Sequence, residues 1–183
     1  MEYHARRRHG YLYYTAWSLI LLAAFVLQSG GVFPALAGVR PLPVLALVCA
    51  FSIFNGVAPG FAFGLAAGVL MDLTSGIPDG FHAIAMSLVG LVLALLSEYL
   101  FNQRLLTAGI LSFAACGLYG LALFLFAELP KGYEGVSGYL GKVTLPSLLY
   151  TWVFVLPFYF LARYLRNASQ RERGHKGTGG AWR

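Results

Sequence analysis

Asp72 is the residue whose type and position most clearly suggest a chemical role. It lies at the end of an apolar run and closes a series in which small residues recur every four positions: Gly56, Gly60, Gly64 and Gly68. A carboxylate inside a membrane or at its edge costs several kcal/mol unless it is paired, solvated or hydrogen-bonded. Asp72 is therefore a candidate functional residue.

Three roles are open for Asp72: fixing the loop that follows it, contacting a partner, and handling protons or ions. The first is favoured, because Thr74, Ser75 and nearby backbone N–H groups could donate hydrogen bonds to the carboxylate. Gly80 and His82 lie where the next apolar run begins, and we expect them to fix the loop or to contact a partner. A proton relay would need a second intramembrane acid, which the sequence does not show.

The four glycines predict close packing of a helix. Small residues four positions apart let two helix backbones approach, and in lipid this packing replaces the missing hydrophobic driving force. A spacing of four exceeds the helical turn of about 3.6 residues, so the glycines wind slowly around the helix and favour a right-handed crossing. We expect them to pack within the molecule. An interface with another protein is the alternative.

Signatures of catalysis and of metal binding are missing. The sequence has no Gly-rich phosphate-binding loop, no His-Glu-x-x-His and no Gly-x-Ser-x-Gly. Cys49 and Cys116 lie in apolar runs without metal-ligand spacing, so we expect them to be small buried hydrophobic residues. We predict no catalytic residue, no cofactor and no metal site. Four further acidic residues fall in expected loops or at helix ends, where a solvated surface position is the default: Asp79, Glu98, Glu128 and Glu134.

The composition is that of an integral membrane protein. Of the 183 residues, 58% are hydrophobic and 11% are charged, whereas a soluble domain carries about 25% charged residues. The apolar residues form long runs, which must be helical in lipid because lipid offers the backbone no hydrogen bonds. The net charge of +6 comes from basic residues gathered at the two ends of the chain. Such clusters indicate membrane topology and contact with anionic lipid, not nucleic-acid binding.

Six apolar runs predict an all-α protein with six transmembrane helices in one domain, residues 11–166. The second and third runs are short, so they either span the membrane or form a re-entrant hairpin, with a turn over Asn55–Pro59 between them. Residues 1–10 are expected to be a basic N-terminus, and residues 167–183 a basic, disordered tail. The first run resembles a signal peptide but is longer, so we expect it to be retained. The runs are Tyr11–Gln28, Leu42–Phe54, Gly60–Leu73, Phe81–Tyr99, Leu105–Ala127 and Val143–Leu165.

The basic residues favour an even number of spans, with both termini in the cytoplasm. If Leu42–Leu73 were one long helix, the two basic ends would face opposite sides of the membrane. With six spans, all but three of the 13 lysines and arginines lie on the cytoplasmic side. The positive-inside rule therefore supports six spans. The three exceptions are Arg40, Lys131 and Lys142.

The central block resembles the bacterial rod shape-determining protein family MreD. The matching segments are Arg40-Pro41, Gly60–Leu65, Gly68–Leu73, Gly76 and Gly80–Ala83, followed by an apolar helix with Gly90. The family consists of small membrane proteins with a glycine-rich helix, an Asp at its end and a Gly-x-His/Asn-Ala step into the next helix. The positions that match its motif are Gly64, Gly68, Asp72, Gly80 and His82.

The resemblance implies a non-enzymatic scaffold of the cell-elongation machinery in the bacterial cytoplasmic membrane. The expected partners are MreC by direct contact, at the Gly60–Gly68 face or the outer loops, and MreB and the RodA–penicillin-binding-protein pair directly or indirectly. The expected fold resembles the membrane substrate-binding subunits of energy-coupling-factor transporters. A vitamin-binding transporter subunit is therefore the main alternative, and an intramembrane enzyme using Asp72 or His82 a weaker one. A homo-oligomer is compatible with the sequence.

Overall fold

The computed structural model describes residues 2–32, 41–75, 80–99, 105–128, 141 and 145–177. The regular structure in these residues is helical, which confirms the predicted all-α class. Six α-helices are present, and a π-helical turn, η1 (Phe124–Glu128), continues the fifth. The α-helices are α1 (Glu2–Ser29), α2 (Pro43–Asn55), α3 (Val57–Asp72), α4 (Phe81–Tyr99), α5 (Leu105–Leu123) and α7 (Leu145–Gly177).

The helices fall into a long and a short class. Three segments are long and apolar enough to cross a membrane: Phe81–Tyr99, Thr107–Phe126 and Leu145–Asn167. The other apolar helical segments are shorter: Tyr13–Ser29, Pro43–Asn55 and Val57–Asp72. With 13 residues, α2 is about 20 Å long, which is less than the hydrocarbon thickness of about 30 Å. The prediction that the second and third helices are short is confirmed, and the six-span topology stays a prediction.

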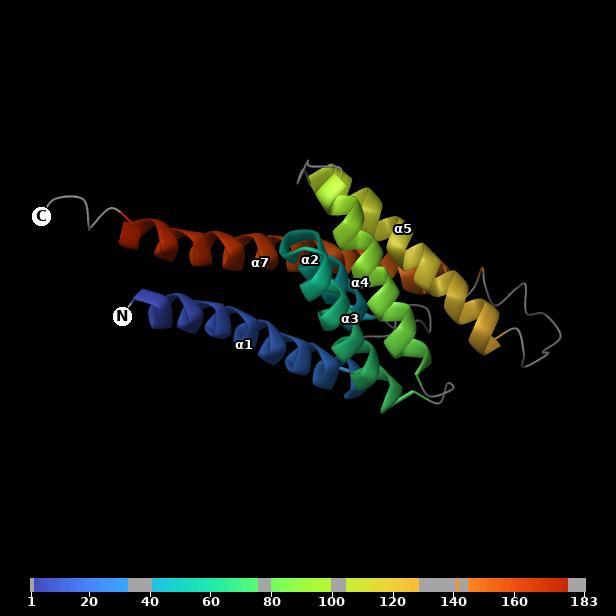
Figure 1. Ribbon diagram of the computed structural model, residues 1–183. Coiled ribbons are helices and arrows are strands. Elements are labelled where there is room, and N and C mark those ends of the chain that lie inside the picture. Colours follow the sequence, from blue (N-terminus) through green and yellow to red (C-terminus); the bar gives the residue numbers. More distant parts are fainter. Residues whose placement is uncertain are drawn as a thin grey trace, which may run out of the picture.

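The short helix α2 is the core of the molecule. Every residue from Pro43 to Ile53 is buried, and α2 packs against α1, α3, α4, α5 and α7. A helix that is apolar on all sides is stable only when other elements surround it. Around it, α1 begins and α7 ends on the same side of the molecule (Figure 1).

A single glycine separates α2 from α3. Gly56 has φ 82°, a conformation that side chains with a Cβ rarely adopt. We expected a turn over Asn55–Pro59, but α3 already begins at Val57. Pro59 is tolerated there because the N–H groups of the first helical turn have no partner within the helix. The two helices are therefore distinct and pack on each other, which excludes one long helix over these residues.

The buried start of α2 is satisfied by its neighbours. The backbone N–H of Val44 donates to Oε1 of Gln28 in α1 at 3.1 Å. The N–H of Leu42 donates to the Thr151 hydroxyl of α7 at 3.0 Å, and that hydroxyl donates to the Ser147 carbonyl at 2.7 Å. Pro43 has no N–H to satisfy. These bonds join α1 and α7 to the same end of α2.

Both ends of the chain are more helical than we predicted. The first helix begins at Glu2 and continues through the basic segment into the apolar run. The tail over residues 167–183, expected to be disordered, is helical as far as Gly177. A helix that is already nucleated extends at little cost through residues of good helix propensity. Glu172 and Lys176 are also four positions apart, a spacing that supports helix.

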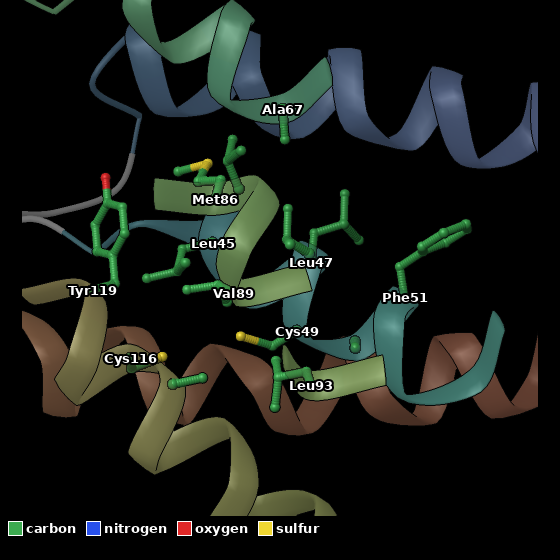
Figure 2. Packing of buried hydrophobic residues seen from close by; sticks show 14 of the residues in the cluster. Leu45, Leu47, Cys49, Phe51, Ala67, Met86, Val89, Leu93, Cys116 and Tyr119 are labelled. Carbon is green, nitrogen blue, oxygen red and sulfur yellow. The ribbon is translucent and has the colours of Figure 1, made fainter. Parts of the chain in front are cut away.

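The two cysteines are buried, as predicted. Cys49 lies on α2 and Cys116 on α5, in a cluster with Leu45, Val89 and Leu93. The Cys49 thiol lies against that of Cys116, and Figure 2 shows its sulfur directed toward the second cysteine. In this position both side chains fill space between α2 and α5.

We expect Thr151→Val to lower the free energy of unfolding by about 1–3 kcal/mol, because it leaves the partly buried N–H of Leu42 without an acceptor. Valine has nearly the same shape as threonine, so a packing effect is small. The control is Thr151→Ser, which keeps the hydroxyl and should cost less. Thermal unfolding in detergent measures both, and equal stability of Thr151→Val and the parent protein would contradict the role of this bond.

Candidate functional site

The predicted site residues lie on a hairpin of two closely packed helices, α3 and α4. Among the described helices, this pair has the most extensive contact. Gly60, Gly64 and Gly68 are buried on the side of α3 that faces α4. They meet positions that are also spaced by four residues along α4: Gly90, Met86 and His82.

The two backbones touch at these glycines. A Cβ at Gly64 would overlap the carbonyl of Met86, and a Cβ at Gly68 would overlap the carbonyl of His82. Gly60 is less tight, since its Cβ would lie 3.1 Å from the Gly90 carbonyl oxygen. At Gly90 on α4 the contact is closer, since an added Cβ would overlap the carbonyl of Gly60. This geometry is the close backbone approach that small residues permit in membrane helices.

The glycine face is therefore filled from within the molecule. We expected these glycines to pack within the molecule, and a partner at the Gly60–Gly68 face was the alternative. The alternative needs exposed small residues, whereas Gly60, Gly64 and Gly68 are buried against α4. The exposed ridge of α3 carries larger apolar side chains: Phe61, Leu65, Val69 and Leu73.

Two glycines outside the close contact shape the backbone. Gly80 has φ 88° immediately before α4, and its carbonyl accepts the N–H of Ile84 at 3.0 Å. A Cβ at Gly80 would meet nothing within 4 Å, so conformation rather than space requires glycine there. Gly56 lies at the opposite end of the hairpin, beside Glu98, with φ 82°.

The Asp72 carboxylate joins the end of α3 to the start of α4. Oδ1 accepts the backbone N–H of His82 and Oδ2 accepts that of Ala83, both at 3.0 Å. A helix N-terminus has unpaired N–H groups and a partial positive charge, so a carboxylate is the acceptor that suits it best. Thr74 and Ser75 do not donate to this carboxylate. Their hydroxyls bond to the carbonyls of Met71 and Asp72 at 3.3 and 3.4 Å.

His82 continues this network into the core. Nδ1 of its buried ring is 2.7 Å from the hydroxyl of Tyr119 on α5. Nε2 of the same ring is buried and has no hydrogen-bond partner. The side chains of Asp72, His82 and Tyr119 therefore connect three helices, α3, α4 and α5. This arrangement holds the helices in place.

The structure thus brings together Gly68, Asp72, Gly80 and His82 at one end of the hairpin. Tyr119 and the capping residues Gln28 and Thr151 were not predicted. The available signal was their polarity inside apolar helices, which marks a functional or structural role without naming the partner. In the helices and turns that the structure describes, no three histidines, cysteines or acids could hold a metal ion. Asp79, Lys131 and Glu134 lie outside the described residues, as does the side chain of Glu128.

Comparison with known protein families shows to which family this chain belongs. A family model described as rod shape-determining protein MreD matches residues 9–167. The chain belongs to the MreD family. The match confirms the resemblance inferred from the central block and extends it across all six α-helices. MreD proteins determine rod shape, so this protein is a membrane protein of bacterial cell-shape determination. No curated protein and no solved structure matches the chain.

The glycine contacts predict a graded effect of adding one methyl group. We expect Gly64→Ala and Gly68→Ala to lower the stability of this MreD protein by about 1–3 kcal/mol, because the helices must separate. Gly60→Ala should cost less, since its nearest atoms are at 3.1 to 3.2 Å. The matched control is Gly117→Ala on α5, where a Cβ meets nothing within 4 Å. That change should be neutral or slightly stabilising, because alanine favours helix over glycine. Thermal unfolding in detergent measures the stability of the four variants, and a different order of stability would contradict this packing.

The Asp72 bonds predict an order among substitutions. Asp72→Ala removes both acceptors and should cost about 1.5–3 kcal/mol for each charge-assisted bond. Asp72→Asn keeps one acceptor oxygen and should lie between Asp72→Ala and the parent protein. The control is Glu98→Gln, which removes a carboxylate charge from the exposed end of α4 and should change stability little. If Asp72→Asn and Asp72→Ala were both as stable as Glu98→Gln in thermal unfolding, a structural role for the carboxylate would be excluded.

Proposed function

We propose that this MreD protein is a non-enzymatic membrane scaffold of the cell-elongation machinery. It binds MreC directly and is linked to MreB and to the RodA–penicillin-binding-protein pair that builds lateral peptidoglycan. The observation that carries the proposal is the bonding of Asp72, the acidic residue that the sequence most clearly marks as a functional candidate. Both of its oxygens bind backbone N–H groups, so it serves as an internal helix cap. Family membership supports the same role.

The protein is placed in the bacterial cytoplasmic membrane with both termini in the cytoplasm. Two observations support this orientation. The start of α1 and the end of α7 lie on the same side of the molecule (Figure 1). Arg8 precedes the apolar part of α1, and Arg163 lies near the C-terminal end of the apolar span of α7; arginines at such positions remain on the cytoplasmic side during insertion.

The contact with MreC is placed on the outer ridge of α3. The glycine face is closed by α4, so a partner helix in the membrane meets the side chains that α3 leaves exposed. Phe61, Leu65 and Val69 are 40%, 40% and 48% exposed and recur every four residues. Side chains in such a row lie along one ridge, which can pack into the groove of another helix.

The vitamin-binding transporter subunit remains the alternative function, and the fold resemblance to such subunits remains a proposal. Recognition of a small molecule needs several polar groups that converge on a pocket. Asp72 and Nδ1 of His82 already bond within the chain, which leaves fewer groups for a ligand. A rise in the unfolding temperature on addition of a vitamin would favour the transporter function.

The scaffold function predicts that a photo-crosslinking amino acid at Leu65 or Val69 forms a covalent adduct with MreC in living cells. The matched control is the same amino acid at Ile110 on α5, whose side chain is 66% exposed. It should give no adduct. The same cells, lacking their own MreD, should keep their rod shape when the parent protein is expressed. Loss of rod shape despite a folded, membrane-inserted protein would contradict the scaffold function, and an adduct at Ile110 alone would move the MreC contact to another face.

A further inference from the structure

A group of hydrogen-bond donors without acceptors lies where α1, α2 and α7 meet. The hydroxyl of Tyr13, the indole Nε1 of Trp17 and Nη1 of Arg166 are all buried, and none makes a hydrogen bond of good geometry, although the Tyr13 hydroxyl lies within reach of the side chains of Trp17 and Asn55. Trp17 is entirely buried. Buried polar groups are normally hydrogen-bonded, so three unpaired groups in one region require an explanation.

The three groups are close neighbours. The Tyr13 hydroxyl lies beside the side chains of Trp17, Asn55 and Arg166. The rings of Tyr13 and Trp17 have centroids 6.3 Å apart. The guanidinium carbon of Arg166 is 5.7 Å from the centre of the Phe54 ring at the end of α2. We call these four polar side chains (Tyr13, Trp17, Asn55 and Arg166) the donor cluster.

Among the residues that the structure describes, no carboxylate pairs with the donor cluster. Trp17 and Arg166 can only donate hydrogen bonds, and the Asn55 amide donates to the carbonyl of Phe51 at 2.8 Å. Among the acidic side chains that the structure describes, Asp72 bonds to the start of α4 and Glu98 is exposed. Neither forms an ion pair with Arg166. A buried N–H group of a guanidinium is costly when it has no acceptor, so the cluster fits an anion supplied from outside the described residues.

The depth of Arg166 indicates where this anion comes from. The apolar span of α7 covers Leu145–Asn167, so Arg166 lies in its last turn. Residues at that depth in a membrane helix meet the lipid headgroups, where tryptophan and tyrosine also prefer to lie. Arg166 is partly exposed, so a headgroup can reach its guanidinium from the lipid side. A guanidinium binds phosphate oxygens with two parallel hydrogen bonds.

We propose that the donor cluster binds the phosphate of an anionic phospholipid in the leaflet that contains both ends of the chain. Arg166 supplies the charge and the paired hydrogen bonds, and the half-buried Tyr13 beside it supplies a single bond from α1, while the fully buried Trp17 holds Tyr13 in place. The lipid thereby joins α1 to α7, which make little contact with each other within the protein. The site is distinct from the α3 ridge proposed for MreC.

Native mass spectrometry of the full-length protein tests this proposal, with cardiolipin and phosphatidylglycerol as probes and phosphatidylcholine as the neutral comparison. The parent protein should retain the anionic lipids in preference. Arg166→Gln should weaken retention by about tenfold, since it removes charge-assisted hydrogen bonds. Tyr13→Phe keeps the aromatic ring and removes the hydroxyl, so it should weaken retention less. The matched control is Arg163→Gln, which removes the same charge from an exposed position one turn earlier and should retain lipid as the parent does.

Several outcomes would overturn the proposal. Equal losses in Arg166→Gln and Arg163→Gln would show only general attraction of basic residues to the bilayer. If inorganic phosphate raised the unfolding temperature as much as cardiolipin, the ligand would be a soluble phosphate. If Arg166→Gln kept its lipid but lost MreC on co-purification, the anion would be an acidic group of a partner. Lipid retention is measured without MreC, so its failure leaves the scaffold function untouched.

Discussion

The backbone contact between α3 and α4 is the constraint on which the rest of the candidate site depends. Asp72 reaches the N–H groups of His82 and Ala83 at 3.0 Å only because the glycines bring the two helices together. Side chains at the glycine positions would separate the helix axes and move the carboxylate away from its donors. The position of α4 beside α3 also brings His82 into hydrogen-bond distance of Tyr119. Packing and polar bonding therefore act together. The glycines set the distance between α3 and α4, and the Asp72 carboxylate sets the register of the two helices.

The central helix α2 imposes the second constraint. Because Pro43–Ile53 is buried on every side, the unpaired N–H groups at its start cannot reach water and must be satisfied by protein. Gln28 and Thr151 meet this need from α1 and α7, which are far apart in sequence. An apolar side chain at either position would leave a buried donor. The polar residues inside these membrane helices are thus explained by the helix that they surround.

From the sequence we could predict those features of the structure that depend on hydrophobic periodicity and composition. Apolar runs located all six helices, and the four-residue spacing of Gly60, Gly64 and Gly68 predicted close packing. The partner of that packing was not predictable, because any apolar helix with small residues could have accepted the stripe. Contacts between distant residues, such as His82 with Tyr119, leave no local pattern at all. The helical tail was missed because basic, Gly-containing composition was read as disorder, while helix propagation from α7 depends on the residues before it.

The same reasoning separates the polar groups that hold the fold together from those that reach beyond it. Asp72, Gln28 and Thr151 each meet a donor or acceptor within the chain, so their chemistry is complete without a partner. The donor cluster around Arg166 differs, since it combines a positive charge with poorly paired donors and, among the described residues, no acid bonded to it. A scaffold is expected to show this division. Its interior must be self-sufficient to stay rigid, and its incomplete sites must lie where lipid or another protein can complete them.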